Sequence, residues 1–230
     1  MISVSFFLHP NRQDNLKTIH DAYKDYDIVD EVLVVTGKEV DTEWCDTKFK
    51  FVHMPGPYTY GAWPSFGLLS RYTFALSCKN RFVFMQDDDF VYSESTMQKM
   101  YNLQEPIIGC HYRWFYNNTY NFKPEKEGEK KADIILTGGT LIDTDYLPDV
   151  IKLAKDFWTD YQNVVNGEDV FLSRALSYIT GKDQFRFIKD NYRELPRFNY
   201  KLAGPINNKK SRRRITRQIY AYFAKLSCQK

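Results

Sequence analysis

The first part of the chain alternates short apolar runs with amphipathic segments. Residues 2–8, ISVSFFL, form an apolar run of strand-forming residues that ends at His9-Pro10-Asn11. Leu16, Ile19 and Tyr23 then recur at helical spacing, and a second apolar run, VLVVT at 32–36, is ended by Gly37. This order predicts two parallel strands joined by a helix in a right-handed crossover.

The same pattern continues up to residue 85. A short strand is expected around Phe51-Val52, followed by a loop rich in proline, glycine and tyrosine at 55–65. A helix is expected at about 66–78 and a fourth strand at 81–85, RFVFM. The loop is long enough to line a binding site.

The second half is more mixed. We expect, in order, an apolar strand at 107–110, an aromatic stretch at 111–122, a solvated charged loop at 123–131, a strand at 133–143 broken by a glycine pair, a helix through Val150 to Phe157 and a helix starting near 167–169. The chain is therefore predicted to be an α/β protein with a mixed, mostly parallel sheet flanked by helices. One domain is expected over 1–205, with a basic amphipathic helical extension at 206–230.

Composition and charge narrow the function classes. Hydrophobic residues make up 43% of the 230 residues and aromatic residues 17%, which is enough for a large core. The net charge is only +3, and the densest basic run lies at 209–217. The rest of the chain is thus nearly neutral, which argues against a nucleic-acid-binding protein.

The cysteines and histidines give no metal or disulfide pattern. The four cysteines, at 45, 78, 110 and 228, are far apart, and the chain has only four histidines. A zinc site is therefore not expected, and we predict reduced, mostly buried thiols. The N-terminal residues lack a basic region, and no apolar stretch approaches the roughly 20 residues of a membrane span. These features predict a cytoplasmic protein.

Three consecutive aspartates, Asp87, Asp88 and Asp89, directly follow the apolar strand at 81–85. Their mutual repulsion must be compensated, and a divalent cation with oxygen ligands would do so. Alternate residues at a strand end point the same way, so Asp87 and Asp89 are the predicted metal ligands. A solvated acidic turn is the alternative, but open α/β sheets bind ligands at this edge, which favours the metal site.

These stretches resemble the glycosyltransferases of the GT-A fold, in which a DXD motif follows a hydrophobic strand. The resemblance rests on the opening strand with its PNR turn (10–12), on FVFMQDDDF (82–90), and on TGGTLIDTDYL (137–147) with NGEDVFLSRAL (166–176). Their order is most similar to the exostosin-like hexosaminyltransferases and more distantly to the β-1,3-galactosyltransferases. It spans about residues 2–178 and leaves open whether configuration is retained or inverted.

The resemblance implies an activity and a set of ligands. The expected reaction is metal-dependent transfer of a sugar from a nucleoside-diphosphate sugar, by default a UDP-sugar, to a hydroxyl of a glycan or glycolipid acceptor. Mn²⁺ or Mg²⁺ is the implied cofactor, held by Asp87 and Asp89. The histidine that some members add to the metal is missing, because no histidine follows His111.

The resemblance also implies donor-binding residues. These are Arg12, Thr36, Arg71, Asp87, Asp88, Gly138 and Gly139. Guanidinium groups pair well with phosphate, although a lone helical arginine such as Arg71 is also a common surface residue. The glycine pair would let the backbone approach a sugar, and a β-bulge explains it equally well.

Glu168 and Asp169 lie where a helix is predicted to begin. Acidic residues there commonly cap the helix and complement its dipole. In the similar families this helix start presents a carboxylate to the acceptor hydroxyl. An inverting enzyme needs a general base at this point, for which Asp169 is the first choice and Glu168 the second. In a retaining enzyme the same group would position the acceptor.

The C-terminal segment 211–226 carries Ile215, Ile219, Phe223 and Leu226 at helical spacing among basic residues. The amphipathic pattern fits a helix that packs back onto the domain. It also fits peripheral contact of 209–226 with an anionic membrane, or an arginine-bearing lid over the donor.

Two other function classes remain open. A sugar-phosphate nucleotidyltransferase would share the sheet and the metal, but it needs a glycine-rich phosphate loop after the first strand, and LHPNRQDN has no glycine. A non-catalytic module that binds nucleotide or sugar would not need the second carboxylate pair at 168 and 169.

Overall fold

The computed structural model describes residues 1–54, 69–116, 119–121, 130–158, 167–189, 192–196 and 209–229, with only the backbone described at 116, 119–121 and 209–212. Its helices are α1 (Gln13–Tyr23), α2 (Ser70–Leu76), α3 (Glu94–Leu103), α4 (Leu147–Phe157), α5 (Glu168–Thr180) and α6 (Lys209–Ser227), with short 3-10 turns η1 (Pro10–Arg12) and η2 (Thr144–Tyr146). Its strands are β1 (Ile2–Leu8), β2 (Val29–Thr36), β3 (Phe49–His53), β4 (Phe82–Met85), β5 (Phe90–Val91), β6 (Ile107–Gly109), β7 (Tyr112–Tyr116), β8 (Thr119–Asn121), β9 (Lys131–Ala132), β10 (Ile134–Ile135), β11 (Thr140–Asp143), β12 (Phe185–Arg186) and β13 (Arg193–Glu194).

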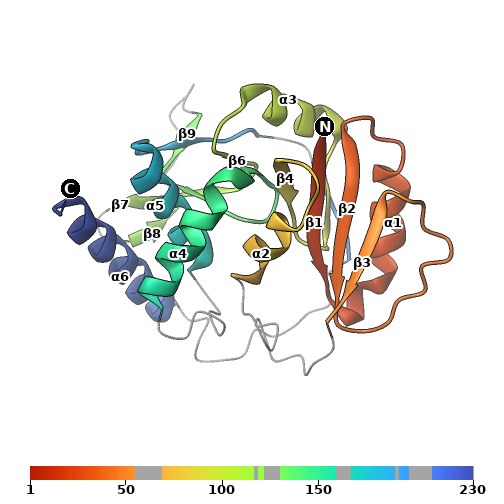
Figure 1. The fold of residues 1–230 in the computed structure, drawn as a ribbon, viewed down its shortest axis with the longest axis horizontal. Coiled ribbons are helices and arrows are strands. Elements are labelled where there is room, and N and C mark those ends of the chain that lie inside the picture. Colours follow the sequence, from red (N-terminus) through yellow and green to blue (C-terminus); the bar gives the residue numbers. More distant parts are fainter. Residues whose placement is uncertain are drawn as a thin grey trace.

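The central sheet has six strands in the order β3-β2-β1-β4-β11-β6 (Figure 1). Strands β1, β2, β3 and β4 are parallel to one another, whereas β11 runs antiparallel to both β4 and β6. The predicted mixed, mostly parallel sheet is therefore confirmed. The strand expected at 133–143 is two strands in different sheets, β10 and β11, separated by the glycine pair.

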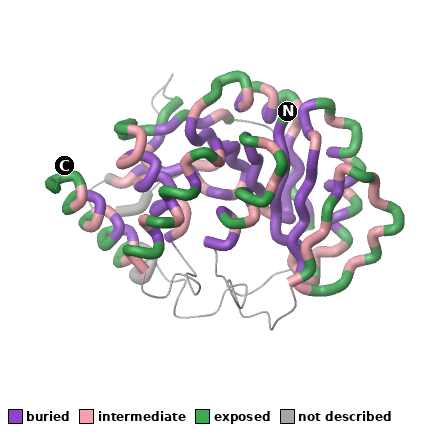
Figure 2. The backbone as a smooth tube through the Cα atoms, viewed as in Figure 1, coloured by how far each residue is buried: buried purple, intermediate pink, exposed green. Residues whose placement is uncertain are grey.

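Helices cover both faces of this sheet, which gives two hydrophobic cores. Val83 and Met85 of β4 face the core formed with α2, α4, α5 and α6. Phe82 and Phe84 point to the other face, where α1 and α3 pack. Figure 2 shows the central strands as the most continuous buried stretches of the chain. Burial on both faces explains why β4, with the sequence FVFM, is apolar throughout rather than alternating.

Local sequence signals define the ends of the helices. Ser93 caps α3 by accepting a hydrogen bond from the Thr96 N–H at 3.3 Å. Helix α3 was not predicted from the sequence, although its buried Met97 and Met100 are spaced for a helix. Helix α5 begins after Gly167 and ends before Gly181, both with positive φ angles (87° and 72°) that glycine adopts without strain.

The C-terminal helix α6 packs back onto the domain. Ile219 and Phe223 are 0% and 1% exposed and belong to the same core as α5. The apolar side that membrane insertion would require is thus used for packing, while Arg213 and Arg214 remain exposed. The predicted boundary at 205/206 lies outside the described residues.

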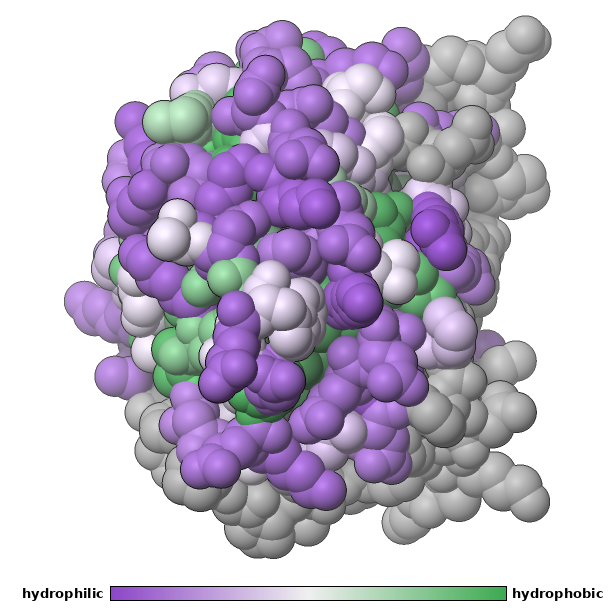
Figure 3. All heavy atoms as spheres, turned by 90° about the vertical axis from the view of Figure 1, so that its right-hand side faces the viewer, coloured by the Kyte–Doolittle hydropathy of each residue, from purple (hydrophilic) through white to green (hydrophobic). Residues whose placement is uncertain are grey.

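Two further sequence expectations can be compared with the structure. All four cysteines are free thiols, but only Cys110 is buried, which corrects the expectation that most would be. In the described part of the chain, no helix has the length and apolar character needed to cross a membrane. The surface on the α1 side is mainly hydrophilic, with hydrophobic atoms confined to small patches (Figure 3).

A buried glutamate ties three parallel strands to the segment after α2. The Glu31 carboxylate on β2 accepts hydrogen bonds from the Ser3 hydroxyl at 2.7 Å, the Lys50 ammonium at 2.8 Å and the Lys79 N–H at 2.8 Å. Burial alone would raise the pKa of Glu31, but these hydrogen bonds outweigh it and lower the pKa below the ordinary value of 4.5. The ionised carboxylate is therefore part of the folded structure.

We predict that Glu31→Gln lowers the free energy of unfolding at neutral pH by about 2 kcal/mol. Because the folded-state pKa is lowered, the contribution of Glu31 is fully present above the unfolded pKa and is lost as pH falls through the folded pKa. Urea unfolding of both proteins at several pH values should show a difference that shrinks below pH 4.5. A difference independent of pH would contradict this account.

Candidate functional site

The candidate site lies at the carboxyl ends of β1 and β4. These two strands are parallel neighbours, with Ser5 opposite Met85. Turn η1 follows β1, and the three aspartates follow β4, so residues far apart in the sequence meet at this edge. Ligands of open α/β sheets bind at this edge.

Arg12 of η1 holds two of the three aspartates. Its Nη1 atom lies 2.5 Å from Asp88 Oδ1 and 3.4 Å from Asp89 Oδ2. The His9 N–H donates to Asp88 Oδ2 at 2.7 Å, and the Asn15 amide donates to the Asp88 carbonyl at 3.0 Å. Burial raises the pKa of Asp88 to about 6, although Arg12 and His9 act in the opposite direction.

Asp87 is held separately, by Arg71 of α2. The Arg71 Nη2 atom lies 2.6 Å from Asp87 Oδ1. Burial would raise the pKa of Asp87, but the charge and hydrogen bond of Arg71 outweigh it and lower the pKa. The Asp87 side chain is 38% exposed, against 5% for Asp88 and 9% for Asp89. Asp87 is therefore the most accessible of the three carboxylates.

The aspartate side chains do not pair up as the alternation of side chains along a strand would predict. Asp88 and Asp89, rather than Asp87 and Asp89, share a partner. Two arginines provide the compensating charge that the sequence analysis assigned to a cation alone. Arg12 and Arg71 were both predicted at the site, and the structure brings both to the aspartates.

The glycine pair packs directly against this cluster. The Gly139 N–H donates to the Met85 carbonyl at 2.9 Å, which fixes the turn beside the end of β4. A Cβ at Gly138 would lie 2.6 Å from Asp87 Oδ2, and one at Gly139 would lie 2.3 Å from the Tyr92 hydroxyl oxygen. Gly139 also has a φ of +90°. The small residues make room for the Asp87 and Tyr92 side chains.

Tyr92 and His111 form a polar pair next to these glycines. The Tyr92 hydroxyl lies 3.0 Å from His111 Nε2 and 3.2 Å from the Gly138 carbonyl oxygen. The sequence analysis did not single out Tyr92, because an isolated tyrosine near a strand carries no distinguishing signal. Its contact with the glycine turn becomes visible only in three dimensions.

The predicted acidic pair lies at the first turn of α5. The Tyr72 hydroxyl, next to Arg71 on α2, donates to the Glu168 carbonyl at 2.8 Å and so anchors the start of α5 to the site. Asp169 Oδ1 accepts from the Val170 N–H at 2.8 Å, a local helix-start contact. Burial and the charge of Asp169 raise the pKa of Glu168 to about 7, against the effect of Arg71. A pKa near neutral pH suits a general base, so Glu168 is a candidate proton acceptor.

The remaining predicted residues are placed only in part. Thr36 lies at the carboxyl end of β2, where its hydroxyl donates to the Lys38 carbonyl at 2.7 Å. The loop expected at 55–65, with Tyr58, Tyr60 and Trp63, falls outside the described residues. Trp114, in the aromatic stretch expected at 111–122, is 3% exposed and packs in the core.

The donor atoms present fit a cation that is shared with a ligand. Among the residues that the structure describes, no three His, Cys, Asp or Glu side chains are grouped to hold a metal ion by themselves. Mg²⁺ and Mn²⁺ commonly use one or two protein carboxylates and take the rest of their oxygens from water and substrate phosphates. The exposed Asp87 carboxylate, with Asp89 in the same turn, meets that requirement.

Comparisons with known proteins bear on the fold. No family model matches the sequence, and no curated protein sequence matches it. Residues 1–349 of TarS from S. aureus, solved with UDP-GlcNAc, superimpose with a TM-score of 0.57 at 14% identity, covering 97% of this chain and 71% of that one. The 4-diphosphocytidyl-2C-methyl-D-erythritol synthase from Anaerococcus prevotii gives a TM-score of 0.49 at 13% identity, covering 97% and 96%.

At these identities the likeness to TarS concerns the fold alone. The central mostly parallel sheet, its helical layers on both faces and the superposition on TarS define a GT-A-like, Rossmann-like α/β domain. This confirms the predicted fold class.

We predict that Gly139→Ala destabilises the protein more than Gly181→Ala. Both positions have positive φ, which costs a non-glycine residue about 1–2 kcal/mol. Only Gly139 also has an obstructed Cβ position, whereas nothing lies within 4 Å at Gly181. Overpacking should add about 1–3 kcal/mol at residue 139. Urea unfolding measures the free energy of unfolding of each variant. Equal decreases in the two variants would show that the Tyr92 side chain moves aside without strain.

Proposed function

We propose that this protein is a glycosyltransferase that moves a sugar from a nucleoside-diphosphate sugar to a hydroxyl group of a glycan acceptor. The observation that carries the proposal is the position of Asp87. It is the exposed carboxylate at the carboxyl edge of the sheet, held by Arg71 and lying against Gly138. Its charge and that of Arg71 also act on Glu168, a second carboxylate of raised pKa.

The donor end of the site is built from Asp87, Asp89 and Arg71. Asp87, with Asp89 as a second carboxylate, would hold Mn²⁺ or Mg²⁺ against the donor diphosphate. When bound, such a cation neutralises the negative charge that develops on the departing nucleoside diphosphate. Arg71 keeps the Asp87 carboxyl ionised, because the pair lowers its pKa. Arg12 contacts Asp89 from η1, and Thr36, at the carboxyl end of β2, is proposed to contact the nucleotide.

The acceptor end of the site is the start of α5. The acceptor oxygen attacks the anomeric carbon of the donor sugar, and the bond from that carbon to the diphosphate breaks. In an inverting transfer, the acceptor proton passes to the Glu168 carboxylate. Burial beside Asp169 suits Glu168 to this role, since a general base works best with a pKa near the operating pH. In a retaining transfer the same carboxylate orients the acceptor hydroxyl.

The fold supports the choice of donor class. TarS 1–349, which superimposes on this chain, was solved with UDP-GlcNAc. A uridine nucleotide is therefore the donor we propose to test first. Any contact with a membrane-bound acceptor would use the exposed arginines of α6, such as Arg213 and Arg214, because the apolar side of α6 packs inward.

We predict that the protein releases nucleoside diphosphate from one member of a panel of UDP-, GDP- and dTDP-sugars in the presence of Mn²⁺. EDTA should abolish release, and Asp87→Asn should lower it by about 10²-fold. Asp25→Asn is a matched control, because Asp25 is exposed and follows the far end of α1. It should leave release unchanged.

The same panel separates the other function classes. Release of pyrophosphate from a nucleoside triphosphate and a sugar phosphate, without turnover of any nucleotide sugar, would identify a nucleotidyltransferase. Metal-dependent nucleotide binding without turnover would indicate a binding module. Turnover unaffected by EDTA and by Asp87→Asn would exclude the proposed cation site.

We further predict that Glu168→Gln lowers acceptor-dependent transfer by about 10²-fold or more, as expected for loss of a general base. Asp169→Asn should lower it far less, because Asp169 binds the helix start through the Val170 N–H. Both variants should retain slow donor hydrolysis, measured without acceptor. A larger loss in Asp169→Asn would restore Asp169 as the acceptor-facing residue.

A further inference from the structure

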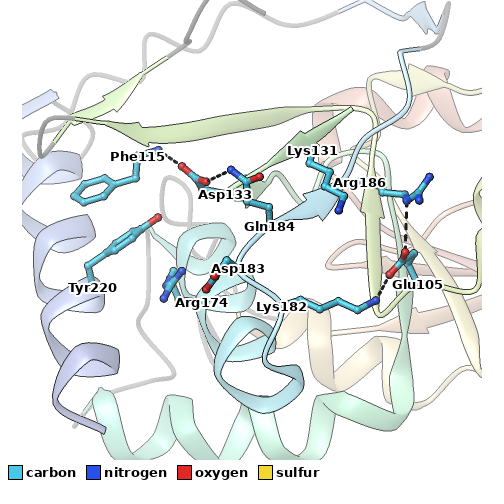
Figure 4. A pocket seen from close by; sticks show the side chains of 10 residues that line it. All are labelled: Glu105, Phe115, Lys131, Asp133, Arg174, Lys182, Asp183, Gln184, Arg186 and Tyr220. Atoms are coloured by element: carbon cyan, nitrogen blue, oxygen red, sulfur yellow. Dashed lines mark hydrogen bonds and ion pairs between the residues drawn. The ribbon is translucent and has the colours of Figure 1, made fainter. Parts of the chain in front are cut away.

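A cavity lies between α5, α6 and the short strands β7, β9 and β12, away from the aspartate cluster. Its volume is about 730 Å³, which is within the range of about 300–1,000 Å³ typical of small-molecule sites. Figure 4 shows its lining side chains, most of which are charged: Glu105, Phe115, Lys131, Asp133, Arg174, Lys182, Asp183, Gln184, Arg186 and Tyr220.

Helix α6 supplies one wall of this cavity through Tyr220. The Tyr220 ring stacks on Phe115 of β7, with ring centroids 3.9 Å apart. The guanidinium carbon of Arg174, on α5, lies 4.8 Å from the centre of the same ring. Tyr220 is thus fixed between a strand and a helix, and this contact sets the position of Arg174.

Two buried donors in this wall have no acceptor. The Nε atom of Arg174 and the hydroxyl of Tyr220 are buried and have no hydrogen-bond partner among the described residues. Buried donors in this state are costly and call for an acceptor. The nearby Asp133 carboxylate does not supply one, since it accepts from the Phe115 N–H at 2.9 Å and from the Gln184 amide at 3.0 Å.

The opposite end of the cavity is also rich in cations. Lys182 pairs with Glu105, and Arg186 Nε lies 3.5 Å from the same carboxylate, so two cations share one anion. Lys131 adds a third positive charge at this end. The lining as a whole carries four basic and three acidic side chains. It therefore offers a ligand both hydrogen-bond donors and hydrogen-bond acceptors, with more donors than acceptors.

We propose that this cavity is a binding site for a saccharide that carries an anionic group, either a carboxylate or a phosphate. The anionic group would accept hydrogen bonds from Arg174 and Tyr220, and the sugar hydroxyls, which both donate and accept, match the mixed remainder of the lining. A free inorganic anion would fill only a small part of about 730 Å³.

The cavity lies along the same helix as the proposed acceptor end of the transfer site. Arg174 is six residues after Glu168 on α5, which is about 9 Å along a helix axis. Six residues also turn an α-helix about 120° away from its starting side, so an acceptor chain that contacts both residues would have to curve around α5. The identification of this saccharide as part of the acceptor rests on the proposed glycosyltransferase function, whereas binding to the cavity does not.

The test is calorimetric titration of the intact protein with four probes. These are a uronate tetrasaccharide, a neutral tetrasaccharide, a phosphorylated tetrasaccharide and an acidic peptide of equal charge. One or both anionic saccharides should bind at least about tenfold more tightly than the neutral one and the peptide. The stronger of the two identifies the anionic group.

Variants locate the binding to the cavity. Arg174→Met keeps an aliphatic stem over Tyr220 and should weaken anionic saccharide binding by about tenfold. Tyr220→Phe keeps the stacked ring and should weaken it by a few-fold. Lys152→Met on α4 removes an exposed positive charge outside the cavity and should have no effect. Donor hydrolysis without acceptor should be unchanged in all three variants.

Several outcomes would overturn the proposal. These are equal binding of the neutral saccharide or of the peptide, full competition by inorganic phosphate alone, no binding of any probe, or wild-type affinity in both Arg174→Met and Tyr220→Phe. Binding that follows these variants in a protein that turns over no nucleotide sugar would retain this site and reject the proposed transferase function.

Discussion

The site depends on how three consecutive carboxylates are accommodated at the end of a buried strand. Their repulsion would make the end of β4 unstable without nearby positive charge. Arg12 follows β1 and contacts Asp88 and Asp89, while Arg71 comes from α2 and contacts Asp87. The acidic turn is therefore stabilised by the parallel pairing of β1 with β4 and by the packing of α2, which bring both arginines to it.

This arrangement gives the aspartates different roles. Asp88 and Asp89 are mostly buried and join the sheet edge to η1, whereas Asp87 stays accessible. The antiparallel strand β11 brings Gly138 against Asp87, and Tyr72 ties the start of α5 to the same helix that carries Arg71. Structural anchoring and ligand access are thus divided between neighbouring residues of one motif.

Much of this was predictable, and the remainder depends on long-range contacts. Mainly apolar runs at 2–8 and 81–85 identified β1 and β4, because strands buried on both faces are mostly hydrophobic. The motif resemblance supplied Arg12 and Arg71, both found at the aspartates. The sequence could not reveal that burial raises the pKa of Glu168, nor that Tyr220 lines a cavity away from the aspartates, since both follow from tertiary packing.

The most direct test of the central claim is the binding of UDP to the wild-type protein and to Asp87→Asn, measured by calorimetry with and without Mn²⁺. If Asp87 holds a cation against the donor diphosphate, Mn²⁺ should tighten UDP binding by at least about tenfold in the wild type and have little effect in the variant. Binding of UDP that is equally tight in both proteins, with or without Mn²⁺, would contradict the account.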